Sequence, residues 1–133
     1  MRFAQPHLRT PVAIATAVLS WLGLYLHNSA ELPNESLLSS ETAYPTLVYL
    51  LGITAWLTVG RRAGAWLLLG WGWLNLVGGA VLSVLPLPIW AYDPAQTARH
   101  YAFHLLYGVL QLPMIVVMTR FVRRTTTPRR PHR

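Results

Sequence analysis

The sequence predicts an all-α integral membrane protein, an antiparallel bundle of four transmembrane helices with both termini cytoplasmic. Hydrophobic residues make up 53% of the 133 residues and charged residues only 11%, well below the roughly 25% of ordinary soluble domains. The apolar residues gather in four stretches of about the 20 residues that a helix needs to cross a bilayer. The charged residues fall between these stretches, and the arginines concentrate on one side.

The first helix is expected over residues 11–30, a stretch without a charged residue. Thr10 suits the N-cap and Pro11 suits the first helical position. Two arginines precede the stretch, as in a secretory signal peptide, but Asn28 is a poor residue for a cleavage site that would follow Ala30. We therefore expect a membrane-spanning helix and not a cleaved signal.

The second helix is expected over residues 44–60 and the third over residues 63–85, because both stretches are apolar and of bilayer-spanning length. Pro86 follows the third stretch and ends it, since proline has no N–H to continue the helical ladder. The connection between these two stretches is so short that the helices are expected to lie side by side.

The fourth helix is expected over residues 94–122, although its apolar part begins later. Asp93, Pro94 and Gln96 resemble a capping box with proline in the first turn, which favours an early start. The transmembrane domain then comprises residues 1–124. Residues 125–133 are rich in arginine and proline and are expected to form a disordered, basic cytoplasmic tail.

The arginines predict the orientation in the membrane. All eleven cationic residues are arginine, and ten of them fall on one side of the four stretches. Arg99 lies on the other side, together with all four acidic residues. Because excess arginine in short connections marks the cytoplasmic face, we expect a multi-pass protein of the plasma (inner) membrane with both termini inside. The exclusive use of arginine hints at a GC-rich bacterial genome.

The net charge of +7 is explained by the bilayer without nucleic acid as a partner. Arginines beside a span attract anionic lipid headgroups, whereas a nucleic-acid interface would need more than a short basic tail. The residues expected to anchor lipid headgroups are Arg61, Arg62, Arg120, Arg123 and Arg124.

The predicted spans hold no acidic or basic residue at mid-depth, which argues against a proton-coupled pump or a cation transporter. Uncharged polar residues recur instead at helical spacing. On the fourth helix, His100, His104, Tyr107 and Gln111 share one face, and Asn75 shares a face with glycines on the third. Such residues hydrogen-bond between helices in a bundle interior.

His27 and His104 are expected at the same depth, about 25 Å and about 24 Å above the inner boundary at 1.5 Å per residue. A four-helix bundle can hold cofactors between facing helices, so the two histidines form a candidate site for a b-type haem or a metal ion. His100, one turn from His104, is a candidate further ligand. The alternative is that all three are histidines at the membrane interface with one end in water.

Asn75 and Gln111 are interpreted first as residues that join helices, which is the usual role of amides in membrane bundles. The alternative is an outward-facing polar cavity for a lipid, quinone or small solute, lined by Trp71 and Trp73. The residues expected to contact a ligand there are His27, Asn75, His100, His104, Tyr107 and Gln111.

No pattern in the sequence favours an enzyme. There is no cysteine, no Ser-His-acid set at one depth, and the spacing of His100 and His104 lacks the glutamate of the zinc-protease motif. The expected function is a non-catalytic accessory or interaction subunit of a larger membrane complex, partnered by other membrane subunits or by copies of itself. The alternative is a small binding or transport protein for a lipid, quinone, haem or metal.

Overall fold

The computed structural model describes residues 10–126, and over these residues the chain is helical without a strand. The elements are α1 (Thr10–Glu31), α2 (Ser40–Thr58), α3 (Arg61–Trp73), the π-helix η1 (Leu74–Leu82) and α4 (Ala98–Thr126). Because η1 continues α3 directly, the chain forms four rods, and the predicted all-α, four-helix fold is confirmed. Three rods are long and apolar enough to cross a membrane: α1, α3 with η1, and α4.

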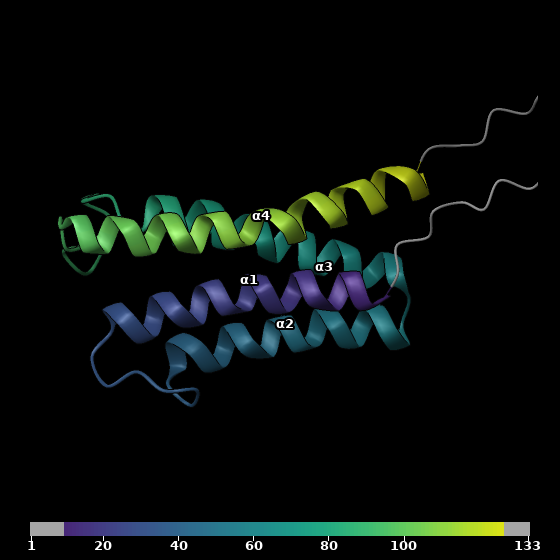
Figure 1. Ribbon diagram of the computed structural model, residues 1–133, viewed down its shortest axis with the longest axis horizontal. Helices are drawn as coiled ribbons and strands as arrows, with labels where there is room; N and C mark the ends of the chain where they lie inside the picture. The colour runs from purple at the N-terminus through teal and green to yellow at the C-terminus, as the bar shows by residue number, and fades with distance from the viewer. Residues whose placement is uncertain (1–9, 127–133) are drawn as a thin grey trace, which may run out of the picture.

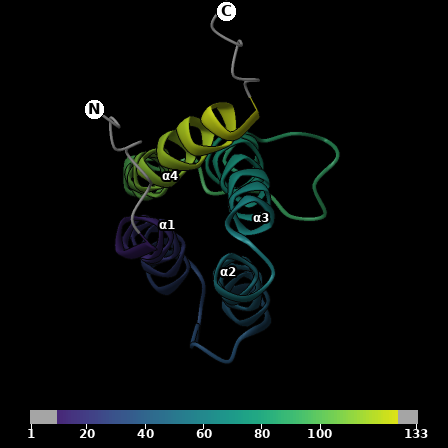
Figure 2. The same cartoon turned by 90° about the vertical axis from the view of Figure 1, so that its right-hand side faces the viewer.

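The four rods run in alternating directions, so that Thr10 and Thr126 lie at the same end (Figure 1). Seen along the rods, they occupy the corners of a square (Figure 2). α1 packs against α2 and α4, and α3 packs against α2 and α4. As the short connection predicts, α2 and α3 are neighbours. We call the end with the α2–α3 connection the arginine end and the opposite end the histidine end.

The start of α2 differs from the prediction: the helix begins at Ser40 and not at residue 44, so Pro45 lies inside it. Proline has no N–H, which leaves the carbonyl of Glu41 without its helical donor. The side-chain amide of Asn28, on α1, donates to this carbonyl at 2.9 Å. A residue of α1 therefore completes the first turn of α2.

The predicted start of α4 at residue 94 is wrong, because the helix begins at Ala98. Gln96 does not cap the helix; its amide donates to the carbonyl of Val84 at 3.1 Å and ties down the connection before α4. Thr97 takes the capping role, since its hydroxyl accepts the N–H of His100 at 3.2 Å.

The far end of α4 is also longer than predicted. It reaches Thr126, so Thr125 and Thr126 are helical and not part of a tail. The rest of the predicted disordered tail, residues 127–133, lies outside the described residues. Pro113 lies within α4, and Figure 1 shows the helix changing direction near its middle, as expected where proline interrupts the ladder.

The π-helix η1 is a feature that the sequence pattern did not predict. The N–H of Ser83 bonds to the carbonyl of Gly78, five residues back, at 3.0 Å. Asn75 donates its side-chain amide to the carbonyl of Trp71 at 2.8 Å. Such wide turns are frequent at functional sites, and here η1 forms one wall of the histidine end.

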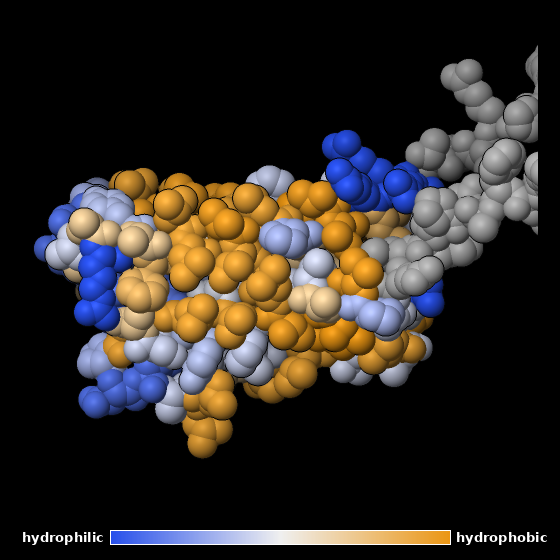
Figure 3. All heavy atoms as spheres, viewed as in Figure 1, coloured by the Kyte–Doolittle hydropathy of each residue, from blue (hydrophilic) through white to orange (hydrophobic). Residues whose placement is uncertain are grey.

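The face of the molecule that Figure 3 shows is apolar along most of its length, between polar ends. Exposed leucines on each long helix include Leu22, Leu50, Leu67 and Leu105. The interior towards the arginine end is filled by one apolar cluster, in which the rings of Tyr49 and Trp56 pack with smaller residues such as Ala17, Ala65 and Met118. This is the distribution that lipid-facing helices require.

Candidate metal centre

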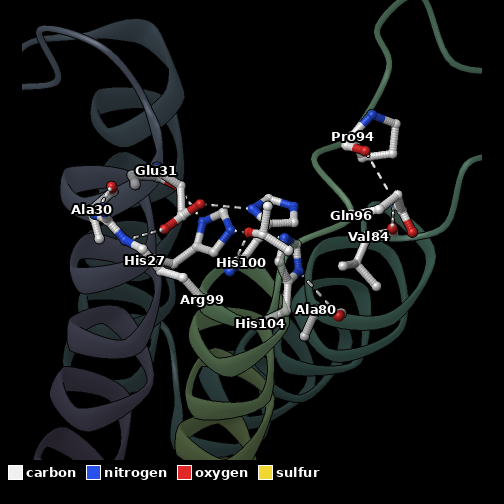
Figure 4. A network of polar contacts seen from close by, with 12 residues as sticks. His27, Ala30, Glu31, Ala80, Val84, Pro94, Gln96, Arg99, His100 and His104 are labelled. Atoms are coloured by element: carbon white, nitrogen blue, oxygen red, sulfur yellow. Dashed lines mark hydrogen bonds and ion pairs between the residues drawn. The ribbon is translucent and has the colours of Figure 1, made fainter.

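Three histidines converge at the histidine end of the bundle. His27 comes from the last turn and a half of α1, and His100 and His104 come from successive turns of α4 (Figure 4). Their ligand nitrogens all lie within 4.8 Å of one another. The ring centroid of His104 lies 4.3 Å from that of His27 and 4.5 Å from that of His100. The three residues therefore meet the distance requirement for ligands of one ion.

Each imidazole is oriented by an oxygen next to its Nδ1 atom. The three pairs are His27 with Asn28 Oδ1 at 3.0 Å, His100 with Glu31 Oε2 at 2.8 Å, and His104 with the Ala80 carbonyl at 3.2 Å. A carbonyl or carboxylate oxygen only accepts hydrogen bonds. Each Nδ1 must therefore carry the hydrogen and donate it.

The amide of Asn28 is itself fixed in orientation. Its nitrogen donates to the carbonyl of Glu41 and, at 3.0 Å, to the hydroxyl of Thr42. The amide oxygen is therefore the atom that faces His27. This interaction links the histidine centre to the first turn of α2.

With each Nδ1 carrying the hydrogen, a neutral imidazole presents a lone pair at Nε2. The Nε2 atoms of His27 and His104 lie 2.9 Å apart. Two lone pairs at this distance repel unless a proton or a cation lies between them. The Nε2 atom of His100 is buried and has no hydrogen-bond partner within residues 10–126. All three lone pairs thus lack a counterpart that the described residues supply.

The Glu31 carboxylate brings negative charge to the centre. Its side chain is 12% exposed and receives both His100 and the guanidinium of Arg99, whose Nε lies 3.3 Å away. Arg99 also donates to the carbonyl of Ala30 at 2.8 Å, which clamps α4 to the end of α1. A carboxylate behind a histidine raises its basicity and offsets the charge of a bound cation.

A cavity of about 320 Å³ opens beside the three rings. It is bordered by Glu31, Ser83 and Asp93 as well as by the histidines. Acidic and hydroxyl side chains make this cavity suitable for water and for the entry of a cation.

The other sequence-predicted site residues form two separate groups. The hydroxyl of Tyr107 donates to Asn75 Oδ1, about one turn below His104. Gln111 lies one turn deeper, where its amide donates to the Ser20 carbonyl at 2.9 Å and its oxygen accepts from the Ser20 hydroxyl. Asn75 and Gln111 therefore each join helices, but at different depths and with different partners.

The two tryptophans assigned to a polar cavity also separate. Trp73 is 50% exposed on the outer face, so it does not line an interior cavity. Trp71 faces inward, with its ring 6.1 Å from that of Tyr49 and at a steep angle to it. Of the two tryptophans, only Trp71 lines an interior cavity as expected.

Two orienting groups of the centre could not be assigned from the sequence in advance. Asn28 adjoins His27 in the chain, which is a weak signal that it could orient the ring. The carbonyl of Ala80 carries no side-chain signal at all, and it reaches His104 because η1 packs against α4. Comparisons with protein families, with curated proteins and with solved structures found no match for this chain.

Proposed function

We propose that this chain is a four-span membrane protein that binds one transition-metal ion at its histidine end, through Nε2 of His27, His100 and His104. The observation that carries the proposal is the orientation of the three rings. Each Nδ1–H donates to a carboxylate, amide or backbone oxygen, and metal-binding histidines almost always hold their second nitrogen in this way.

A small ion suits this geometry better than a haem. Nε2 atoms 2.9 Å apart leave no room for a porphyrin between His27 and His104. Two nitrogens bound tetrahedrally to zinc at about 2.0–2.1 Å from the ion lie about 3.3 Å apart. The rings would have to separate by only about 0.4 Å to reach that arrangement.

A shared proton between His27 and His104 is the simplest alternative, and it explains less. It would relieve the 2.9 Å contact between the two Nε2 atoms. It would leave the buried Nε2 of His100 without a partner. One cation would give all three rings a partner, since one ring nitrogen of each histidine lies within 4.8 Å of the other two.

The donor set favours zinc or another borderline divalent ion. Imidazole nitrogens suit zinc, copper, nickel and iron, and the chain has no cysteine to supply thiolate. Three protein ligands leave a fourth coordination position open for water or a ligand. Structural zinc sites, in contrast, have all four positions filled by the protein.

The membrane setting is part of the proposal. Three rods meet the length and apolarity of a span; we infer that α2, with 19 residues and exposed leucines on its outer face, is the fourth. Arg61, Arg62, Arg120, Arg123 and Arg124 belong to the arginine end, which the charge rule puts in the cytoplasm beside anionic lipid. The histidine centre then faces the outside of the plasma membrane.

An accessory role in a larger complex stays a prediction. The exposed apolar faces suit lipid and partner helices alike, and the contacts within residues 10–126 do not favour one over the other. Metal binding is compatible with such a role and can be tested on the isolated chain.

The experiment is equilibrium zinc binding by the full chain purified in mild detergent, with stoichiometry from elemental analysis. We expect one zinc per chain. His27→Ala, His100→Ala and His104→Ala should each lower the affinity by at least about 100-fold. His7→Ala and His132→Ala are the matched controls, since they remove the two other histidines of the chain. Absence of zinc from the folded wild-type chain, or equal loss in the controls, would contradict the proposal.

A further inference from the structure

A second cavity, of about 720 Å³, lies on the other side of His27. Its volume is in the range of small-molecule binding sites, about 300–1,000 Å³. Its apolar wall includes Leu24, Trp71, Leu74, Gly78 and Trp90. Among the three histidines only His27 borders it, and it adjoins the cavity beside the metal centre, with which it shares Leu32, Ser83 and Tyr92 as well as His27.

The cavity exists because two rods separate at the histidine end. α2 packs against α3 near the arginine end, whereas η1 packs against α4 and makes at most a few contacts with α2. The cavity is lined by Pro45 from α2 on one side and by residues of η1 on the other. Leu24 of α1 and Tyr107 of α4 also line it, so the cavity lies between all four rods at the histidine end.

Several neutral polar residues lie in the wall of this cavity, and Asn75 and Tyr107 are the two that bond to each other there. Asn75 uses one amide hydrogen for the Trp71 carbonyl and its oxygen for the Tyr107 hydroxyl. An amide nitrogen has two hydrogens and a phenol oxygen has acceptor lone pairs. The pair can therefore still donate one hydrogen bond and accept one from a ligand.

The charge of the lining selects against ionic ligands. Among the described residues that border the cavity, Glu41 is the only one with a permanent charge, and it is exposed at the rim. No arginine is among these residues to pair with a carboxylate or phosphate inside. A ligand with an uncharged hydroxyl or carbonyl end avoids the cost of an unpaired buried charge.

We propose that this cavity binds an uncharged bilayer amphiphile, with its hydroxyl or carbonyl end at Asn75 and Tyr107 and its apolar body between α2 and η1. The inference goes beyond metal binding, because none of its contacts requires an ion. It does place the polar end of the ligand beside His27, which borders both cavities.

The test uses a radiolabelled monoacylglycerol and measures saturable binding to the full chain in detergent. Gly78→Leu fills the cavity: a Cβ there meets only Leu74 Cδ1, at 3.7 Å, so a side chain can enter the space. We expect it to lower the affinity about tenfold or more. Gly70→Leu is the matched control, on the same rod with nothing within 4 Å of its Cβ, and should leave binding unchanged.

Two further measurements address the polar end and the source of the ligand. Tyr107→Phe should weaken monoacylglycerol binding several-fold, at the roughly 0.5–1.5 kcal/mol of one hydrogen bond. A fatty acid of the same chain length should compete poorly because its carboxylate is charged. A short-chain quinone that competes well would identify a carbonyl ligand of the same class, whereas failure to compete would leave the hydroxyl lipid as the ligand.

The proposal is overturned if Gly78→Leu binds monoacylglycerol like the wild type, or if the fatty acid competes equally well. Two variants distinguish failure of this proposal from failure of the metal-binding proposal. His104 does not border this cavity, so His104→Ala should lose zinc and keep the amphiphile. Gly78→Leu should lose amphiphile binding and keep zinc binding.

Discussion

At the arginine end of the bundle, small side chains bring helices into direct contact; at the histidine end, η1 and the start of α2 leave cavities between them. A Cβ at Gly64 would lie 2.5 Å from the backbone of Trp56, so α2 and α3 touch there. At the other end the 720 Å³ cavity separates α2 from η1. The comparison indicates that close packing fixes the fold at one end, which leaves the other free to expose imidazoles and amides to ligands.

The sharpest test of the histidine end is how zinc affinity depends on pH. Protons compete with a metal for the same three Nε2 lone pairs, so affinity is expected to fall as pH falls. Between about pH 7.5 and pH 5.5 we expect zinc affinity to drop by more than about 100-fold. Isothermal titration at the two pH values measures this. An affinity that does not change with pH would show that the imidazoles are not the ligands.

The orienting carboxylate gives the next largest effect. Glu31→Gln keeps the shape of the side chain but removes the charge behind His100, and should lower zinc affinity about 10- to 100-fold. Glu41→Gln is the control, because Glu41 is exposed and does not contact the three histidines. Equal effects of the two substitutions would mean that only overall charge matters and not orientation.

The arginine end should respond in stability and not in metal binding. Gly64→Ala places a Cβ against the Trp56 backbone and should lower the free energy of unfolding by about 1–3 kcal/mol. Gly70→Ala, at an open position, should be neutral or stabilise by up to about 1 kcal/mol. Thermal unfolding in detergent compares them. If Gly64→Ala also lost zinc, the two ends would not be independent.

The smallest effect is expected from a substitution at Gln111, which lies between the two ends of the bundle. Gln111→Leu removes an amide that joins α1, α2 and α4, but the hydroxyls of Ser20 and Tyr49 lie 2.7 Å apart and can still bond to each other. We expect a loss of about 0.6–2 kcal/mol in unfolding free energy, with zinc and amphiphile binding unchanged. A change in amphiphile affinity would extend the proposed cavity to this depth.

The helices could be predicted from the sequence because apolar length and arginine placement are strong, local signals. That His27 and His104 lie at the same depth could also be predicted, by counting the rise per residue along α1 and α4. The π-helix could not be predicted, since the Gly78–Gly79 pair weakens an α-helix but does not specify wider turns. The partner of Asn75, Tyr107, could not be predicted either, because it depends on how η1 packs against α4.

The predicted starts of α2 and α4 were wrong for a related reason. Proline and capping residues were taken as local boundary signals, but Pro45 is accommodated by Asn28 from another helix and Gln96 bonds to Val84. A bonding partner that lies 12 or 13 residues away in the chain cannot be read from a local pattern. Such contacts decide the boundaries in this protein.

The bond from Asn28 to the carbonyl of Glu41 has a consequence for the order of assembly. Without α1, α2 would carry a carbonyl that Pro45 leaves bare, and an unpaired backbone group is costly within a bilayer. We therefore expect α2 to enter the membrane as the second half of a hairpin with α1, and not as an independent helix. Residue 28 would then act during biogenesis, before any ligand is present.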